Sequence, residues 1–185
     1  MDSTELKEEF KYLELTADQQ KDVKFLLESA SKDSARPVLE CIFADNGNLI
    51  VADGFQMVVI PNEIGIPDGL WRFPRKMADI IKIFPEGGNF PDYKQIFPSS
   101  GSFATMLTPD DKTNIPDGII CFDPAKLTKI IKYADYRASI TIKTLENSAA
   151  KTPIIIQGKL KYTETKFFAI LMPMRSDNTE FFDPR

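Results

Sequence analysis

The stretch Phe167-Phe168-Ala169-Ile170-Leu171-Met172-Pro173-Met174-Arg175 is an apolar, strand-like run that stops at a proline between two methionines. Taken alone, such a run is typical of a buried strand whose proline lies at the edge of a sheet. Two other segments lie upstream in a fixed order. Together, the three segments favour a more specific interpretation than an ordinary buried strand.

The first of these segments is the turn Val51-Ala52-Asp53-Gly54-Phe55-Gln56-Met57-Val58-Val59, and the second is Asn89-Phe90-Pro91-Asp92-Tyr93-Lys94-Gln95-Ile96-Phe97-Pro98. Together with the C-terminal run, they resemble the bacterial DNA sliding clamp, the beta subunit of DNA polymerase III. Ala35-Arg36-Pro37-Val38-Leu39-Glu40-Cys41-Ile42 is also similar to a clamp strand. The chain departs from the family at Phe55 and Gln56, where histidine and arginine are usual.

The resemblance implies a pocket that grips short peptides of polymerases and repair proteins, with glutamine followed by a leucine-phenylalanine pair as the expected motif. Methionine and aromatic side chains suit a groove that accepts several related peptides. The expected pocket residues are Leu39, Gly54, Phe55, Gln56, Met57, Pro91, Tyr93, Gln95, Ile96, Met172, Pro173, Met174 and Arg175.

A strand, a helix and three strands are expected in the first half of the chain. Residues 10–15 are strand-like, and Thr16 to Gln19 has the form of a capping box that opens a helix. Val23, Leu26, Leu27 and Ala30 recur at helical spacing and predict one apolar face. Tight turns at 45–48 and 53–54 separate the expected strands 38–44, 49–52 and 56–60.

The same order is expected again further along. Residues 70–84 predict a strand and a helix, because Met77, Ile80, Ile81 and Phe84 have helical spacing. The polar region 99–117 predicts a loop with at most one strand. A strand at 118–122 precedes a helix that Asp123 caps and that carries Leu127, Ile130, Ile131 and Ala134 on one face. Strands follow at 139–144, 153–157 and 167–172.

The predicted fold class is α+β and DNA-clamp-like, with two strand-helix-three-strand units, antiparallel sheets and amphipathic helices packed on one side. A single domain is expected over 1–175, with a first unit at 8–62, a connector at 63–117, a second unit at 118–175 and a tail at 176–185. Clamp subunits have three such domains, so about a domain and more is missing relative to the family.

Basic side chains on the predicted helices suggest contact with DNA. The net charge is −4, yet lysines lie opposite the apolar stripes, where they form either a phosphate-facing surface or an ordinary solvated face. The expected DNA-facing residues are Lys21, Lys24, Lys32, Arg75, Lys76, Lys82, Lys126, Lys129 and Lys132.

Enzymatic chemistry is not expected, because the chain has no histidine and no glycine-rich nucleotide motif. No cofactor and no metal are expected, and Cys41 and Cys121 are expected to be buried free thiols. The absence of a long apolar run and of a signal-like start favours a cytoplasmic protein without membrane contact.

The sequence therefore predicts a clamp-like accessory protein of DNA replication or repair, a processivity or recruitment factor that binds peptide motifs of polymerases or repair proteins. Contact with duplex DNA without sequence preference and assembly into a homo-oligomer are implied by the resemblance and stay open. The alternative is a peptide-binding adaptor or regulator that neither forms a ring nor binds DNA. Phe181 and Phe182 of the tail are hypothesised to plug the chain's own pocket or to bridge subunits.

Overall fold

A nine-stranded antiparallel sheet organises the part of the chain that the structure, a computed structural model, describes: residues 10–96, 123–135, 139–142 and 153–172. The strand order is β1-β6-β5-β2-β3-β4-β9-β8-β7. The bounds are β1 Lys11–Glu14, β2 Ile42–Asp45, β3 Asn48–Ala52, β4 Gln56–Pro61, β5 Gly69–Arg72, β6 Ile80–Pro85, β7 Ser139–Ile142, β8 Ile154–Lys159 and β9 Lys166–Leu171.

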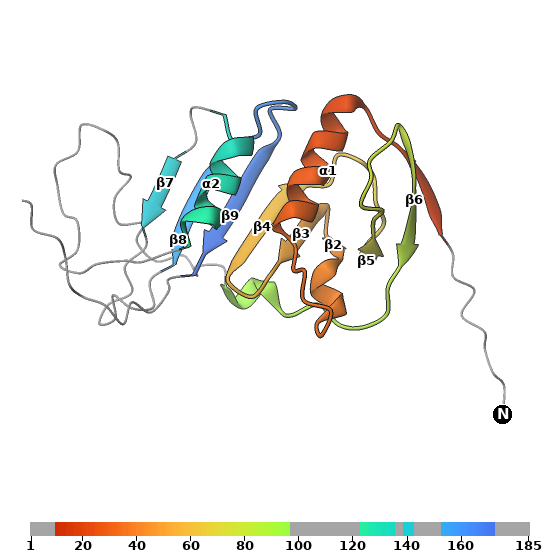
Figure 1. Ribbon diagram of the computed structural model, residues 1–185, viewed down its shortest axis with the longest axis horizontal. Coiled ribbons are helices and arrows are strands. Elements are labelled where there is room, and N and C mark those ends of the chain that lie inside the picture. The colour runs from red at the N-terminus through yellow and green to blue at the C-terminus, as the bar shows by residue number, and fades with distance from the viewer. Residues whose placement is uncertain (1–9, 97–122, 136–138, 143–152, 173–185) are drawn as a thin grey trace, which may run out of the picture.

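Helices α1 (Ala17–Ser29) and α2 (Pro124–Tyr133) lie side by side on one face of this sheet (Figure 1). α1 begins at the expected capping box: Gln19 N–H donates to Thr16 Oγ1 at 3.2 Å, and Thr16 N–H donates to Gln19 Oε1 at 2.9 Å. α2 begins at Asp123, whose carboxylate accepts from the Ala125 N–H at 2.9 Å. Both predicted helix starts are therefore confirmed.

The central strands bury apolar side chains on both faces of the sheet. Toward the helices, residues such as Leu49, Val51 and Val58 form the main core with Phe25 of α1 and Ile130 of α2. On the other face, a smaller group of five buried residues packs together, and we call it the outer cluster: Ile50, Met57, Val59, Tyr93 and Ile170. Alternate residues of β3 and β4 thus serve two separate cores, as the period of two in a strand requires.

Within the sheet, the six strands β2-β3-β4-β9-β8-β7 are arranged symmetrically about the pair β4–β9, and β5, β6 and β1 extend one side only. Each helix is followed along the chain by three antiparallel strands, β2-β3-β4 after α1 and β7-β8-β9 after α2. The last strands of the two sets meet at the centre, where Met57 pairs with Ile170. The strand expected at 118–122 and the loop expected at 99–117 lie outside the described residues.

The helix predicted within 70–84 is wrong. This segment forms β5 and β6 instead, and β6 pairs with β1 on one side and β5 on the other. Ile81 and Ile83 are buried, whereas Ile80 and Phe84 are 63% and 38% exposed, so the period is two. Three β-branched isoleucines favour the strand, and the apparent helical spacing arose because both periods fit so short a segment.

Two smaller corrections concern the segments before β2 and on α2. Residues 38–41 are not extended as predicted, since Pro37–Glu40 form the 3-10 helix η1 before β2 begins. On α2, Ile130 is fully buried but Ile131 is 50% exposed, so the apolar face is narrower than predicted. Among the described residues, no helix is long and apolar enough to cross a membrane.

Candidate functional site

The turn at 53–56 and the end of β9 lie side by side. The Met172 N–H donates to the Phe55 carbonyl at 2.8 Å, and Gln56 pairs with Leu171 in the β4–β9 ladder. Phe55 and Met172 are 58% and 39% exposed. Two large apolar side chains therefore stand at the surface where the two segments meet.

Asp53 fixes the shape of this turn. One of its carboxylate oxygens, Oδ1, accepts from the N–H groups of Phe55 and Gln56, each at 2.9 Å. Gly54 has a φ of +93°, and a Cβ at this position would lie 2.9 Å from the guanidinium of Arg36. The turn therefore favours glycine for its backbone conformation, whereas the exposed Arg36 side chain can move aside.

The third segment reaches the same region through Tyr93, which opens the 3-10 helix η2 (Tyr93–Ile96). Its ring is buried in the outer cluster with Met57 and Ile170. Its hydroxyl donates to Asp45 Oδ2 at 2.6 Å, and Phe90 stacks on Phe43 with 4.9 Å between ring centroids. Tyr93 thus anchors residues 90–96 over the face of the sheet that the helices leave uncovered.

Burial and hydrogen bonding at this anchor shift the pKa values of Tyr93 and Asp45 in opposite directions. Burial, and then the hydrogen bond to Asp45, raise the pKa of Tyr93 to about 12. Hydrogen bonds from Tyr93 and Lys94 lower the pKa of Asp45. The tyrosine is therefore a donor and the aspartate an acceptor throughout the neutral range.

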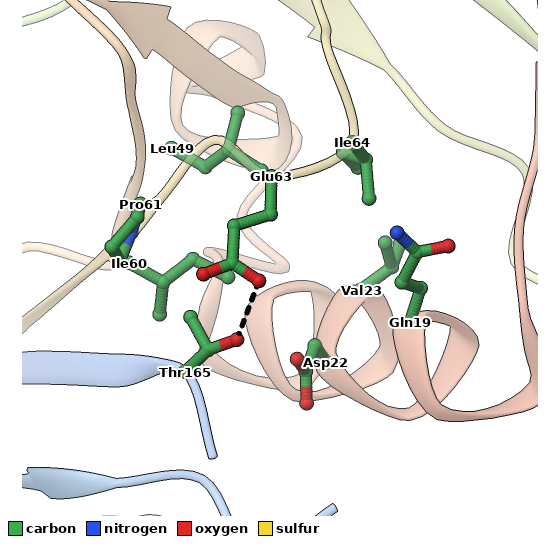
Figure 2. Close-up of a pocket in the computed structure, with 9 residues that line it drawn as sticks. All are labelled: Gln19, Asp22, Val23, Leu49, Ile60, Pro61, Glu63, Ile64 and Thr165. Carbon is green, nitrogen blue, oxygen red and sulfur yellow. Dashed lines mark hydrogen bonds between the residues drawn. The ribbon is translucent and has the colours of Figure 1, made fainter. Parts of the chain in front are cut away.

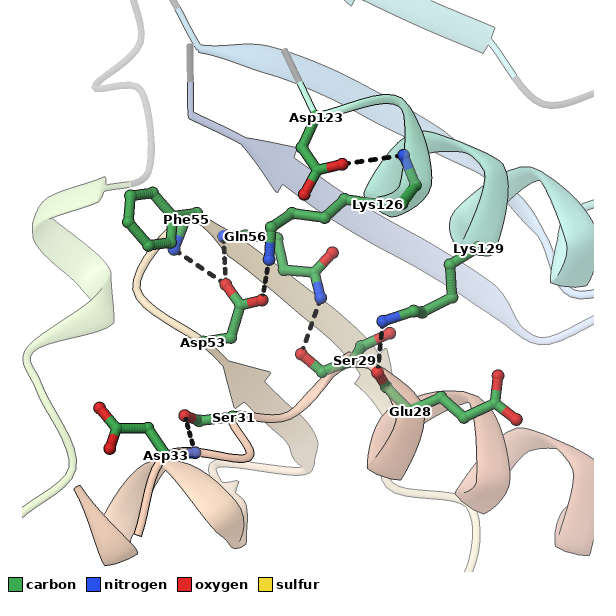
Figure 3. A network of polar contacts seen from close by, with 11 residues as sticks. Glu28, Ser29, Ser31, Asp33, Asp53, Phe55, Gln56, Asp123, Lys126 and Lys129 are labelled. Atoms are coloured by element: carbon green, nitrogen blue, oxygen red, sulfur yellow. Dashed lines mark hydrogen bonds and ion pairs between the residues drawn. The ribbon is translucent and has the colours of Figure 1, made fainter. Parts of the chain in front are cut away.

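Several of the expected pocket residues lie elsewhere or outside the described side chains. Gln56 is buried toward the helices, where its Nε2 donates to the Ser29 carbonyl at 2.9 Å (Figure 3). Leu39 is buried in η1, outside the outer cluster, and Pro91 is exposed. The side chains of Gln95 and Ile96 are not described, and Pro173, Met174 and Arg175 lie outside the described residues, as do Phe181 and Phe182.

The lysines of α2 lie against partners in the protein. Lys126 pairs with Asp53, and Lys129 Nζ donates to the Glu28 carbonyl at 2.6 Å (Figure 3). Lys132 lies 3.7 Å from Glu28 Oε2. Burial, and then the charges of Lys126 and Lys32, lower the pKa of Lys129. Helical spacing identified this basic face but did not identify the partners, which come from α1 and the 53–56 turn.

The other expected DNA-facing residues divide into two sets. In the first set, Lys21 pairs with Asp18, and Lys82 of β6 has its Nζ 3.5 Å from the centroid of the Phe10 ring. In contrast, Lys24, Lys32, Arg75 and Lys76 are exposed and line a single groove of about 910 Å³ beside α1. We call this the α1 groove, and it is separate from the outer cluster.

A second cavity, of about 20 Å³, lies between α1 and the 61–64 loop, and sequence reasoning missed it (Figure 2). Asp22 lines it and is only 6% exposed. Its Oδ2 accepts from the Thr163 hydroxyl at 2.5 Å, while its Oδ1 has no hydrogen-bond partner. Burial is the main cause that raises the pKa of Asp22 to about 6.

The expectations from the sequence concern both metal-ligating groups and cysteines. No group of three or more Cys, Asp or Glu side chains in them is arranged to hold a metal ion. Cys41 is a buried free cysteine, and burial raises its pKa to about 11, which keeps the thiol protonated. Cys121 lies outside the described residues.

Comparison with known families finds none that matches the chain, and comparison with curated proteins finds no match either. Among solved structures, the chain is similar to the H. pylori beta clamp in complex with diflunisal. The two share 10% identity at a TM-score of 0.40, and the likeness covers 95% of this chain and 69% of that chain. A likeness of this size carries no functional inference.

Proposed function

We propose that the chain is a sliding-clamp-like accessory protein of DNA replication or repair, acting in the cytoplasm, that recruits partner proteins through short peptide motifs. It catalyses no reaction in this role. The observation that carries the proposal is the meeting of three separate segments, the 53–57 turn, the 90–93 segment and the end of β9, around the outer cluster.

The chemistry of this surface suits a peptide with apolar anchors. Phe55 and Met172 are exposed, and each lies two residues along the chain from a buried member of the outer cluster, Met57 and Ile170 respectively. Exposed apolar side chains therefore stand at the ends of the two strands that carry much of the outer cluster. Adaptable methionine side chains are a common feature of peptide grooves. A glutamine-containing peptide that ends in a leucine-phenylalanine pair is the expected ligand.

The test is a titration of such a peptide against the unsubstituted full chain and two variants. In each variant, one apolar side chain is replaced by alanine. Met172→Ala removes an apolar side chain at the proposed surface, whereas Ile80→Ala removes a more exposed one on β6. Met172→Ala should weaken binding roughly 5- to 30-fold, the equivalent of about 1 to 2 kcal/mol. Equal affinities for all three proteins, or no binding, would refute the peptide site.

A second candidate is an adaptor that binds peptides without encircling or contacting DNA. The observation in its favour is that Lys126, Lys129 and Lys132 are already held by groups on α1 and the 53–56 turn. A paired lysine gains less from a phosphate, because its existing contact must first break. Mass in solution with and without duplex DNA separates the candidates: a clamp-like ring gains mass on DNA, and an adaptor does not.

A further inference from the structure

We infer that the α1 groove binds a small organic polyphosphate, such as a nucleoside polyphosphate. The inference goes beyond the proposed function, because it requires neither the peptide surface nor a ring. It rests on the distribution of unpaired charge over residues 10–96, 123–135, 139–142 and 153–172.

Most basic side chains in this part of the chain have a partner. Eleven of its lysines and arginines form an ion pair, a hydrogen bond or a ring contact: Lys11, Lys21, Arg36, Arg72, Lys82, Lys94, Lys126, Lys129, Lys132, Lys159 and Lys161. The five that have none are Lys24, Lys32, Arg75, Lys76 and Lys166. Four of these five line the α1 groove.

The acidic side chains in the groove do not neutralise these four cations. Glu28 lies 3.7 Å from Lys132, and Glu40 accepts from Arg72 at 3.1 Å. Arg72 also pairs with Glu86 at 2.8 Å. Because each carboxylate already faces another cation, the groove keeps an excess of positive charge that a multivalent anion would complement.

The geometry favours more than a single phosphate. Lys24 lies on α1, Lys32 follows that helix, and Arg75 and Lys76 belong to the loop between β5 and β6. Cations from three segments surround one concave space, and an arginine guanidinium can bind a phosphate with two parallel hydrogen bonds. Several phosphate groups, or one extended chain of them, would engage all three segments.

Apolar side chains in the same groove point to an organic body attached to the phosphates. Leu27 and Met77 are half-buried, and Phe73 is buried. The volume of about 910 Å³ is within the range of small-molecule sites, which combine apolar walls with a few polar groups. Phe73 belongs to the main core and Leu27 and Met77 pack against it, so inorganic phosphate alone would leave only the exposed parts of Leu27 and Met77 uncovered.

The experiment measures binding of three probes to the full chain: a nucleoside triphosphate, inorganic triphosphate and a short single-stranded oligonucleotide. Lys24→Glu combined with Lys76→Glu reverses charge at two exposed walls of the groove. The matched control, Lys161→Glu with Lys166→Glu, makes the same change at exposed positions near the β8–β9 turn. Lys24→Gln with Lys76→Gln is the milder variant if reversal lowers stability, and thermal unfolding monitors each fold.

The expected result is a loss of at least ~10-fold in affinity for the groove variant, a change below ~2-fold for the control, and weakening of binding with salt. The nucleoside triphosphate should bind more tightly than either other probe, whereas tighter binding of the oligonucleotide would overturn the inference in favour of a nucleic-acid surface. Equal losses in both double variants, or no binding of any probe at low salt, would overturn the inference. Neither outcome depends on the peptide titration, so failure here is distinct from failure of the proposed function.

Discussion

Lys126 and Asp53 form an ion pair that joins helix α2 to the turn between β3 and β4. Their side chains are only 20% and 14% exposed, so water screens the pair weakly. The other oxygen of Asp53 accepts from the N–H groups of Phe55 and Gln56. The second half of the chain therefore stabilises the turn that borders the proposed peptide surface in the first half.

Replacing Lys126 by methionine should destabilise the protein by about 1 to 2 kcal/mol, because the partly buried carboxylate of Asp53 loses its cation while the apolar stem is kept. Urea unfolding measures the change. Lys166→Met is the control, since Lys166 is exposed and has no ion pair among the described residues. Equal stability of the two variants would show that the contact contributes nothing to the fold.

Replacing Asp22 by asparagine should stabilise the protein at neutral and alkaline pH. Burial raises the pKa of Asp22 to about 6 from an ordinary 3.8, so above about pH 6 its ionised carboxylate is less favourable in the folded protein than in the unfolded chain. This penalty disappears as the pH falls to about 4, where both states bind the proton. The amide oxygen of the substituted side chain would still accept from the Thr163 hydroxyl, as the carboxylate does.

The expected gain is on the order of 1 to 3 kcal/mol at about pH 8 and close to zero at about pH 4. Thermal or urea unfolding at several pH values measures it, with Asp68→Asn as the control at an exposed position. A gain that does not depend on pH would mean that ionisation of Asp22 is not its cause.

Replacing Tyr93 by phenylalanine should destabilise the protein by about 1 kcal/mol at about pH 8, because the hydrogen bond to Asp45 is lost while the ring stays in the outer cluster. The pKa of Tyr93 is raised to about 12 from 10.0, so the stability that the protonated hydroxyl provides is present below pH 10 and lost as the pH rises toward 12. The difference in unfolding free energy between the two proteins should therefore shrink over that window. A constant difference would contradict the assignment.

Local signals in the sequence predict much of this fold. The capping residues Thr16 and Asp123 locate both helix starts, because a cap is a contact between residues two or three apart. Tight turns likewise locate β3 and β4. The helix prediction for 70–84 fails because the spacing of Met77, Ile80 and Phe84 also fits a helix. The strand is stabilised instead by pairing with β1, which lies more than sixty residues earlier in the chain.

The site was predictable only in part. Three motifs in the sequence suggested that the turn at Asp53, Tyr93 and Met172 lie near one another. In the structure, the segments that carry them meet around the outer cluster. Helical spacing showed which lysines share a face but not what they touch, and Lys126 finds its partner 73 residues away along the chain. The α1 groove depends on side chains from three segments, so no single stretch of sequence carried its signal.

The proposed peptide site is tested most directly by a residue-resolved NMR titration of the isotope-labelled full chain. The ligand is the peptide in which a glutamine is followed by a leucine-phenylalanine pair. The proposed function predicts the largest shifts in the amides of Gly54 to Met57, Tyr93 and Ile170 to Met172, and little change at Lys24 or Lys76 in the α1 groove. Shifts concentrated in the α1 groove, or an unchanged spectrum at saturating peptide, would contradict it.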